Sequence, residues 1–441
     1  MHTQFDALII GFGKAGKTLA VALAGAGQRV ALVEQSPQMY GGTCINIACI
    51  PTKTLVSAAA AGQSIDEAFA RKTAVVTKLN NKNYHMLADN PGVMIIDGTA
   101  SFVDAHTVSV QAGEQRIELQ ADRLFINTGA VPVMPAIAGL EQSAHVYTST
   151  EVLNQQLKPR RLAVIGAGPI GLEFASTYAA LGVEVTLYHR RPQLLPHEEP
   201  SVAQAVAQAL EAQGITLVLA SDIQQVRDTD HGVAVIRGGD EQVYDAVLVA
   251  AGRRPNTSQL RLAAAGVETD ERGAVVVNDH LQTTQPHIWA LGDVNGGPQY
   301  TYVSLDDFRI VKSQLLGDGN YTRAQRAVLP HVIFMQTPLA RVGLTEAAAR
   351  AQYGDDVKVK ELPAMAVPRM HVDNKTTGLL KAVVQPSTGR ILGATLFCQQ
   401  APEVINTIKT VMDAGLPYTT LRDQIFTHPT VSEALNDLFA I

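Results

Sequence analysis

Apolar runs that end at glycine-rich segments are the dominant pattern in the N-terminal and middle parts of the chain. Residues 5–10, apolar except for Asp6, lead directly into the glycine-rich segment 11–16, and an Ala- and Leu-rich segment follows. Residues 28–33, apolar from Val30 onward, are expected to form a second strand, which ends at Glu34. This order predicts a buried strand, a tight turn, a helix and a second strand, as at the start of a parallel α/β sheet.

The same order of elements recurs in the middle of the chain. Residues 161–165 lead into a second glycine-rich segment, 166–171, and the strand-like segment 183–188 follows a helix-like segment. Three more apolar runs end in small residues, which would let a cofactor lie close to the backbone; these are residues 125–129, 247–252 and 288–293. The repeat predicts two nucleotide-binding α/β domains.

The C-terminal part has a different pattern. Residues 379–384 indicate a strand, and residues 403–414 indicate a helix. Strands and helices mixed in this way predict a separate α+β layer.

Composition narrows the class of protein. The chain has 441 residues, of which 46% are hydrophobic and 17% charged, so it can bury several cores and we expect roughly two to four domains. A net charge of −6 offers no basic surface for nucleic acid or anionic lipid. Neither a nucleic acid nor a membrane is therefore expected as a partner.

Cysteine content and hydropathy bear on location. Three cysteines are too few for the disulfide framework of a secreted protein, and a first motif at Gly11 leaves no room for a signal peptide. We also expect no window with the run of about 18 apolar residues that a membrane span needs. The expected location is the cytoplasm, where thiols stay reduced.

The spacing of the first glycine segment suits a dinucleotide. Gly11 can turn the chain, Gly13 lets backbone amides approach a pyrophosphate, and Gly16 lets the helix pack on the strand. Glu34 lies 18 positions after Gly16, where a ribose hydroxyl needs an acceptor. The first unit therefore predicts a site for an adenine dinucleotide with an unphosphorylated ribose.

The second unit, residues 166–171, differs at the corresponding ribose position. The residue 18 positions after its last glycine is His189, and Arg190 and Arg191 follow. The carboxylate acceptor is missing and cations stand nearby, which favours a 2′-phosphate and hence NADPH over NADH. The alternative is that both arginines are simply solvated at the end of a strand.

Two cysteines, Cys44 and Cys49, lie five positions apart in the segment GGTCINIACIPTK, residues 41–53. A zinc site is poorly supported, because Cys398 is isolated and no second Cys or His cluster has ligand spacing. No metal-binding residues are therefore assigned. A structural disulfide is disfavoured in a reducing compartment. Redox chemistry is the interpretation that is left, and Cys398 is expected to belong to a core.

Helix geometry restricts how the two cysteines could pair. Residues five apart in an ideal helix have Cα atoms about 8 to 9 Å apart, whereas a disulfide needs less than about 7 Å. A bridge between Cys44 and Cys49 would require distorted first turns, which Gly41, Gly42 and Pro51 would permit. A helix N-terminus would also lower a thiol pKa and favour the thiolate.

These motifs together resemble one enzyme family. The segment GGTCINIACIPTK is similar to the active-site signature of the flavoprotein disulfide reductases, which include lipoamide dehydrogenase, glutathione reductase and mercuric reductase. The two glycine motifs, the runs that end in Thr128-Gly129 and Gly292-Asp293, and the C-terminal segment 428–433 (HPTVSE) follow the family's order. Within the family the chain is most similar to the mercuric-reductase-like branch.

The resemblance implies an α/β fold with two Rossmann-like dinucleotide-binding domains, for FAD and NAD(P)H, and a C-terminal α+β dimerisation domain. Residues 1–145 and 263–325 are expected to form the two segments of the FAD-binding domain. Residues 146–262 are expected to form the NAD(P)H-binding domain, and residues 326–441 the interface domain. A homodimer is the implied assembly.

The resemblance also implies where the cofactors bind, with FAD on the first glycine motif and NADPH or NADH on the second. The cofactor-binding residues implied in this way are Gly11, Gly13, Gly16, Glu34, Gly42, Thr43, Lys53, Thr128, Gly129, Gly166, Gly168, Gly171, His189, Arg190, Gly252, Gly292 and Asp293.

Roles for four further side chains follow from the resemblance. In such enzymes hydride passes to the flavin and electrons then move to the disulfide. Cys49 would face the flavin ring, and Cys44 would attack the substrate. Lys53 would lie near the redox-active nitrogen of the flavin and pair with Glu173. The alternative for Lys53 and Glu173 is an ordinary charge on a helix surface.

His428 and Glu433 match the acid/base pair of the family, in which the glutamate orients the imidazole and the imidazole manages the proton of the exchange thiol. In the family this pair serves the site of the partner subunit. The chain departs from the family at Thr301-Tyr302-Val303-Ser304, where relatives commonly have Thr-His-x-Ala. It also lacks the vicinal C-terminal cysteines of mercuric reductases, which makes efficient handling of mercury doubtful.

The leading hypothesis is an FAD-dependent NAD(P)H oxidoreductase that passes electrons through flavin and the Cys44–Cys49 disulfide to a thiophilic acceptor. That acceptor would be a disulfide or a reducible metal ion such as Cu(II) or Hg(II). Two alternatives stay open. Reduced flavin could give electrons directly to oxygen or a quinone, or the cysteine pair could serve a redox sensor without catalytic turnover.

Overall fold

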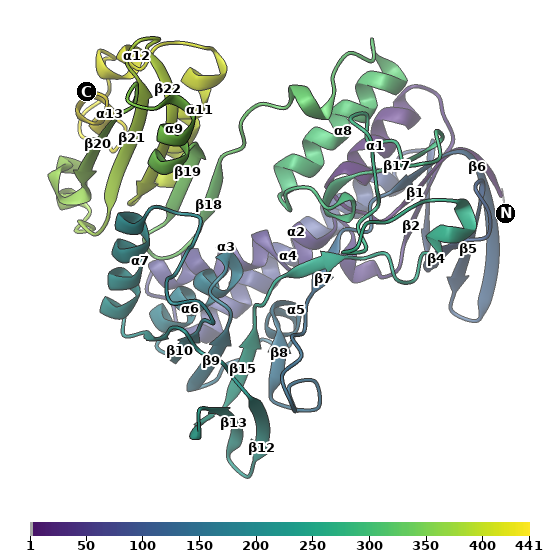
Figure 1. Ribbon diagram of the computed structural model, residues 1–441. Coiled ribbons are helices and arrows are strands. Elements are labelled where there is room, and N and C mark those ends of the chain that lie inside the picture. Colours follow the sequence, from purple (N-terminus) through teal and green to yellow (C-terminus); the bar gives the residue numbers. More distant parts are fainter. Residues whose placement is uncertain (1–2) are drawn as a thin grey trace.

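A computed structural model describes residues 3–441 of the chain (Figure 1). The first domain is built on a seven-stranded sheet in the order β3-β2-β1-β6-β5-β4, and β17 pairs with β6. The strands are β1 (Gln4–Ile10), β2 (Val30–Glu34), β3 (Val93–Asp97), β4 (Thr99–Phe102), β5 (Thr107–Ala112), β6 (Gln115–Ile126) and β17 (Ile288–Ala290). The helices are α1 (Lys14–Gly25), α2 (Thr43–Asn46), α3 (Cys49–Ala60), α4 (Ile65–Ala88) and α8 (Thr301–Leu316), with the 3-10 turns η1 (Pro37–Met39), η2 (Leu262–Ala265) and η3 (Gly292–Asn295).

Strand β1 is buried on both faces of this sheet. Leu8 and Ile10 pack into one core with β4, β5 and β6, whereas Ala7 and Ile9 pack into another core with α1 and α8. The strand pairs in parallel with β2 on one side and β6 on the other. Because a parallel strand covered on both faces is apolar, residues 7–10 form an unbroken apolar run after Asp6.

The second domain has a five-stranded parallel sheet in the order β11-β10-β9-β15-β8. A three-stranded antiparallel sheet, β12-β13-β14, and a two-stranded ribbon, β7-β16, lie beside it. The strands are β7 (Ala130–Pro132), β8 (Val146–Thr148), β9 (Arg161–Ile165), β10 (Glu184–Tyr188), β11 (Thr216–Val218), β12 (Gln225–Thr229), β13 (Gly232–Arg237), β14 (Asp240–Tyr244), β15 (Ala246–Val249) and β16 (Arg253–Pro255). The helices are α5 (Ser149–Asn154), α6 (Pro169–Ala180) and α7 (Pro200–Ala212).

The third domain is an antiparallel sheet in the order β18-β19-β22-β21-β20, set apart at the upper left of Figure 1. Its strands are β18 (His331–Ile333), β19 (Leu339–Gly343), β20 (Lys358–Pro363), β21 (Leu379–Gln385) and β22 (Arg390–Phe397). Its helices are α9 (Glu346–Tyr353), α10 (Pro368–Val372), α11 (Ala401–Asp413), α12 (Thr419–Arg422) and α13 (Ala434–Leu438), and η4 (Arg323–Gln325) and η5 (Ala364–Ala366) are short turns before and within it. Cys398 is fully buried in its core, as expected.

Ion pairs connect the second and third domains. The carboxylate of Glu198, in the segment before α7, lies 3.1 Å from the Nε atom of Arg341 in β19. The neighbouring Glu199 pairs with Lys381 of β21. The fold is therefore the expected one, with two dinucleotide-type α/β sheets and a C-terminal α+β domain. The residue boundaries of these domains stay a prediction.

One stretch is apolar and long enough to cross a membrane by length and composition, Thr43–Ala60, so the expectation that no such window exists was wrong. The reason is that α2 and α3 follow each other closely and are both rich in small and apolar residues. The stretch contains both cysteines of the pair and packs against α4 and α6. A single segment of this kind is weak evidence for a membrane span.

Candidate active site

One cavity of about 1190 Å³ connects the first glycine turn, the cysteine pair and the start of α6. This volume exceeds the roughly 300–1,000 Å³ of a site for one small molecule, so it suits an extended ligand such as a dinucleotide. Twelve of the residues expected in the site line this cavity: Gly11, Gly13, Glu34, Gly42, Thr43, Cys44, Cys49, Lys53, Thr128, Gly129, Glu173 and Asp293.

The first glycine turn is shaped by Asn127 at the end of β6. A Cβ atom on Gly11 would lie 2.4 Å from the Asn127 carbonyl oxygen, and one on Gly13 would lie 2.5 Å from Asn127 Oδ1. The Gly16 amide donates to the same Oδ1 atom at 2.9 Å. Larger residues would push α1 away from the sheet, so the turn keeps its backbone amides directed at the cavity. Asn127 has no motif of its own, and only its place before Thr128-Gly129 could have indicated it.

Glu34 ends β2 inside the cavity. Its Oε2 atom accepts a hydrogen bond from the Phe12 amide at 2.9 Å, and Oε1 accepts from the Ser36 amide at 3.3 Å. The side chain is 7% exposed, and this burial raises the carboxyl pKa although the amide hydrogen bonds oppose the shift. A buried acceptor at this strand end fits the ribose hydroxyls of an adenine dinucleotide.

Gly42 brings the cysteine segment against the glycine turn. Its φ angle is +78°, and a Cβ atom there would lie 2.7 Å from the Cα atom of Gly13. No side chain other than hydrogen fits such a contact. The two segments that would hold the flavin dinucleotide are thus in direct backbone contact.

The helix is interrupted between the two cysteines. Cys44 lies in α2, which ends at Asn46, and Cys49 is the first residue of α3. Ile47 and Ala48 between them have non-helical backbone angles, with φ of −139° and −145°. Both cysteines are free thiols in this structure. The interruption is the distortion that a Cys44–Cys49 bridge requires.

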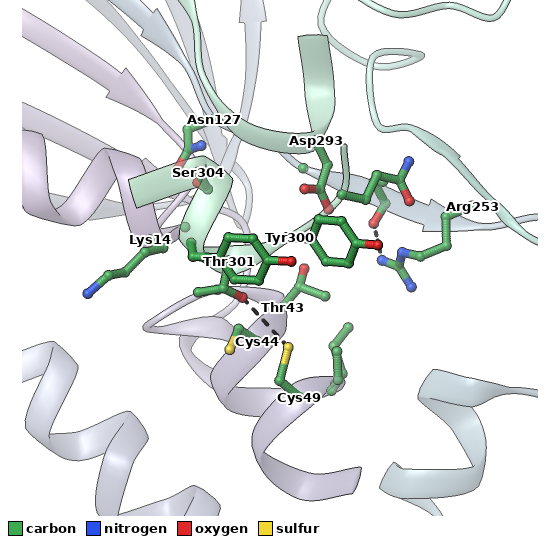
Figure 2. A pocket seen from close by; sticks show the side chains of 18 of the residues that line it. Lys14, Thr43, Cys44, Cys49, Asn127, Arg253, Asp293, Tyr300, Thr301 and Ser304 are labelled. Atoms are coloured by element: carbon green, nitrogen blue, oxygen red, sulfur yellow. Dashed lines mark hydrogen bonds between the residues drawn. The ribbon is translucent and has the colours of Figure 1, made fainter. Parts of the chain in front are cut away.

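The environment of Cys49 favours its thiolate. Its pKa is lowered to about 6, first because the Cys44 thiol donates a hydrogen bond to it, and further because of the Thr301 hydroxyl and the Lys53 charge. The Cys49 Sγ atom lies 3.6 Å from Thr301 Oγ1 (Figure 2). The same hydrogen bond with Cys49, together with burial, raises the pKa of the Cys44 thiol. Cys49 is therefore the anionic member of the pair.

Thr301 belongs to the segment 301–304 where the chain departs from the family pattern. It begins α8, and Ser304 one turn later accepts a hydrogen bond from the Ala15 amide at 3.2 Å. Tyr300 and Tyr302 line the cavity on either side, with rings stacked 5.0 Å apart. The sequence marked the segment 301–304 only as a departure that would change the contacts of the flavin, and it did not indicate the contact between Thr301 and Cys49.

Lys53 and Glu173 form the expected pair, with Nζ 2.6 Å from Oε2. Glu173 is buried in α6, and its Oε1 atom also accepts from the Phe334 amide at 3.0 Å. The Lys53 ammonium lies 4.8 Å from the centre of the Phe334 ring. Phe334, which sequence reasoning missed, joins the third domain to this pair.

Asp293 follows β17 at the opposite end of the flavin site. Burial raises its carboxyl pKa, and the nearby Arg253 charge opposes the shift. Figure 2 shows Asp293 and Arg253 on the same side of the cavity. The preceding Gly292 amide donates to Asp307 at 2.7 Å, and Asp307 pairs in turn with Arg326. The glycine turn, Glu34 and Asp293 together provide the donors and acceptors that fit FAD.

The second glycine turn has one open position. A Cβ atom on Gly166 would lie 2.5 Å from the Ala250 carbonyl oxygen, and one on Gly171 would lie 1.8 Å from the Gly166 carbonyl oxygen. Nothing lies within 4 Å of a Cβ atom on Gly168, directly before α6. Gly252, between β15 and β16, likewise has nothing within 4 Å of a Cβ atom. This space at a helix N-terminus fits a pyrophosphate.

His189 follows β10, and its pKa is lowered, first by burial and then by Arg191 and Arg190. Its Nε2 atom is buried and has no hydrogen-bond partner in the structure. Both arginines are exposed beside it. Two exposed arginines at this strand end fit a nucleotide phosphate.

His428 and Glu433 form the expected pair, but away from the cysteines. His428 Nδ1 lies 2.7 Å from Glu433 Oε2, and this contact lowers the glutamate pKa. The imidazole is 70% exposed. Of the residues that the structure describes, neither member of this pair lines the cavity that contains Cys44. The single chain therefore does not bring the acid/base pair and the cysteines together.

The remaining expected cofactor residues also lie outside the cavity lining: Gly16, Gly166, Gly168, Gly171, His189, Arg190, Gly252 and Gly292. Gly16 and Gly292 act through packing or backbone contacts with lining segments. Across residues 3–441 there is no group of three or more His, Cys, Asp or Glu side chains that could hold a metal ion.

Comparison with known proteins extends this picture. Residues 5–307 match the pyridine nucleotide-disulphide oxidoreductase family, and residues 329–439 match the dimerisation domain of that family. The chain is 49% identical over 438 residues to the probable pyridine nucleotide-disulfide oxidoreductase RclA of Escherichia coli strain K12, covering 99% of both chains. It is 36% identical over 453 residues to a mercuric reductase of Lysinibacillus sphaericus, covering 98% of this chain and 81% of that protein.

A solved structure, described as the Cu(II) complex of HOCl-induced flavoprotein disulfide reductase RclA from Escherichia coli, matches with a TM-score of 0.98. It is 48% identical and covers 100% of this chain and 99% of its own. These matches confirm the resemblance to the flavoprotein disulfide reductases, the expected fold and the expected cofactors, FAD and NAD(P)H. The dimerisation domain supports the expected homodimer. The chain belongs to the pyridine nucleotide-disulphide oxidoreductase family.

Proposed function

We propose that the protein takes electrons from NAD(P)H and passes them through FAD and the Cys44–Cys49 pair to a thiophilic acceptor. Its class, a pyridine-nucleotide-dependent flavin disulfide or metal oxidoreductase, follows from the family. The observation that carries the proposal is the place of Cys49. It begins α3 inside the shared cavity, and its thiol pKa is lowered to about 6.

Different residues of the cavity bind the cofactor, supply charge and carry the proton. When bound, FAD supplies two-electron transfer between the nicotinamide and the disulfide. Glu34 and Asp293 would hold the hydroxyls of the dinucleotide, and Lys53, fixed by Glu173, would supply a positive charge to the flavin. Cys49 holds negative charge next to the flavin. Cys44, whose pKa is raised, carries the proton of the reduced pair.

A disulfide acceptor would be reduced in two balanced exchanges. The Cys44 thiolate attacks one sulfur of the acceptor, and the other sulfur leaves and takes up a proton. The Cys49 thiolate then attacks Cys44, the Cys44–Cys49 disulfide re-forms, and the second acceptor sulfur leaves as a thiolate that takes up a proton from solvent. We assign the proton transfer to His428 of the partner subunit, because the imidazole is exposed and held by Glu433.

A reducible metal ion is the other acceptor class. Thiolates bind soft ions, and oxidation of the dithiol supplies two electrons, enough for two Cu(II) ions or one Hg(II) ion. The description of the related RclA structure as a Cu(II) complex supports copper, and the mercuric reductase relatives support mercury.

The test is an acceptor screen of the FAD-loaded enzyme with NADPH and NADH, in native and Cys44→Ser forms. The proposal predicts that Cys44→Ser abolishes reduction of disulfides and metal ions while flavin reduction by NAD(P)H continues. Equal acceptor reduction in both forms would instead show that flavin gives electrons directly to the acceptor. Negligible turnover of the native enzyme with every acceptor would favour a redox sensor. We place this activity in the cytoplasm, where a supply of reduced nicotinamide is available.

A further inference from the structure

Lys17 is a buried lysine beneath the segment that carries the cysteines. It lies in α1 and is 5% exposed. Its Nζ atom lies 3.5 Å from the Gly41 carbonyl oxygen and hydrogen-bonds to the Oδ1 atom of Asn83 in α4. Both acceptors are neutral. The charged or titratable groups that act on it are Lys14 on its own helix and Cys44.

Burying an ammonium without a carboxylate partner raises the free energy of its charged form, and this lowers its pKa. Burial, and then the Lys14 charge, lower the pKa of Lys17 to about 8, while Cys44 acts in the opposite direction. An amine with that pKa is still mainly protonated at pH 7. The site therefore keeps a positive charge in the interior where no carboxylate balances it.

Lys17 packs against Gly41, at the start of the segment that carries the cysteines. Gly41 has a φ angle of +95°, and a Cβ atom there would lie 3.1 Å from Asn83 Cγ. Lys17 and Asn83 thus pack directly against the segment three residues before Cys44. Cys44 lines the cavity, whereas Lys17 is not among the lining residues. Gly41, whose carbonyl oxygen Lys17 contacts, lines the cavity as Cys44 does.

We propose that Lys17 is a positioning residue whose buried ammonium is the counter-charge for the thiolate of Cys44. The inference rests on the proposed function, in which Cys44 attacks the acceptor. Cys44 is otherwise a poor nucleophile, because its hydrogen bond with Cys49 and its burial raise its pKa. The groups that oppose this shift are the Thr301 hydroxyl and the Lys17 charge. Lys17 acts through Cys44 and touches neither the acceptor nor the cofactors.

A purely structural role is the competing explanation, since Lys17 also ties Gly41 to Asn83. The two roles separate by substitution. Lys17→Met removes the charge, and Lys17→Gln removes the charge while keeping an amide that can donate to Gly41 and Asn83. Asn83→Ala keeps the charge and removes a packing partner. Lys72→Met is the matched control, because Lys72 is also buried and bonded only to a carbonyl, that of Leu153, in the part of the chain described.

The experiment measures alkylation of Cys44 by iodoacetamide as a function of pH, with the modified residue identified by mass spectrometry. The FAD-loaded enzyme carries Cys49→Ser throughout, so that Cys44 is the reactive active-site thiol. We expect Lys17→Met and Lys17→Gln to move the midpoint of the profile upward by about one pH unit and to slow alkylation at pH 7 about tenfold. Asn83→Ala and Lys72→Met should keep the reference profile, and Lys17→Arg should restore it.

An unchanged midpoint in both charge-removing variants would overturn the inference, as would an equal shift in Asn83→Ala. If Lys17→Met fails to bind FAD, the comparison of Lys17→Gln with Lys17→Arg decides. In chains that keep Lys17, the reciprocal effect is measured by NMR of labelled lysine: Cys44→Ser should lower the Lys17 pKa, and an unchanged value would also refute the pairing.

The outcome is separable from that of the proposed function. The alkylation profile reports the Cys44 thiol whatever the acceptor is, and the acceptor screen with Cys44→Ser tests the function without reference to Lys17. If only the alkylation test fails, the proposed function still stands.

Discussion

The Lys53 ammonium lies 2.6 Å from the Glu173 carboxylate, although the two residues belong to α3 and α6 and are 120 positions apart. The second oxygen of the same carboxylate accepts from the Phe334 amide. One side chain therefore joins three distant segments at the point where the two dinucleotide sites meet.

We expect Glu173→Gln to slow flavin reduction by NADPH about tenfold, because the neutral amide holds the Lys53 ammonium less firmly at the flavin edge. Because Lys53 is about a third exposed, the free energy of unfolding should fall by only about 1 kcal/mol. Anaerobic stopped-flow absorbance measures the rate, and chemical denaturation measures the stability. Glu184→Gln is the control, since it removes a surface pair with Arg161 in the same domain. Equal rates in both variants would count against a role for the pair.

Reduced enzyme should show a long-wavelength charge-transfer band from the Cys49 thiolate to oxidised flavin. The Cys49 pKa is lowered from about 9 to about 6, so the band should persist at neutral pH and fade as the pH falls through about 6. Cys49→Ser should abolish it. Absorbance spectra after anaerobic addition of two electrons, recorded across pH, provide the measurement, and a band that survives Cys49→Ser would reverse the assignment of the two cysteines.

Thr301→Val should move the midpoint of that titration upward by about one pH unit, because the hydroxyl that stabilises the thiolate is lost. Thr301→Ser keeps the hydroxyl and should titrate like the native enzyme. If the valine and serine variants titrate alike, the hydroxyl has no electrostatic role.

The parts of the site that could be predicted from the sequence are those encoded locally. The first glycine turn, the Glu34 strand end and the two cysteines each lie in one short segment, where spacing alone restricts the geometry. The interruption between Cys44 and Cys49 was also predictable, because a regular helix holds residues five apart too far from each other.

The residues that were missed act across long distances in the chain. Thr301 contacts Cys49 across 252 positions, and Asn127 accepts from Gly16 across 111. A threonine or an asparagine has no spacing rule of its own, so its role appears only when the sheet brings strand ends to one edge. The apolar character of Thr43–Ala60 was misjudged for a related reason, since small residues that pack helices closely also raise hydropathy.

The choice between NADPH and NADH can be tested at the end of β10. Arg190→Ala with Arg191→Ala should lower kcat/KM for NADPH about tenfold and leave that for NADH nearly unchanged, because the 2′-phosphate loses its cations. Steady-state kinetics with both nucleotides provide the comparison. Unchanged values for both would mean that the two arginines are only solvated.

We expect each reaction site to combine the cysteine pair of one chain with the acid/base pair of its partner. His428 is exposed and bonded to Glu433, and neither residue lines the cavity of its own chain. Residues 329–439 match the dimerisation domain of the family, which supports a homodimer of two such chains. Removal of either Cys44 or His428 should therefore inactivate a homodimer at both of its sites.

Subunit exchange between Cys44→Ser and His428→Ala chains tests this claim most directly. In a mixed dimer one site would carry both substitutions and the other neither, so its acceptor reduction should approach half that of the native dimer. Assays before and after exchange, with the mixed dimer isolated by two different affinity tags, give the result. Recovery toward half of the native activity is what a shared site predicts. Activity that stays at the background of the two parents would show that each chain uses its own histidine, and would contradict the account.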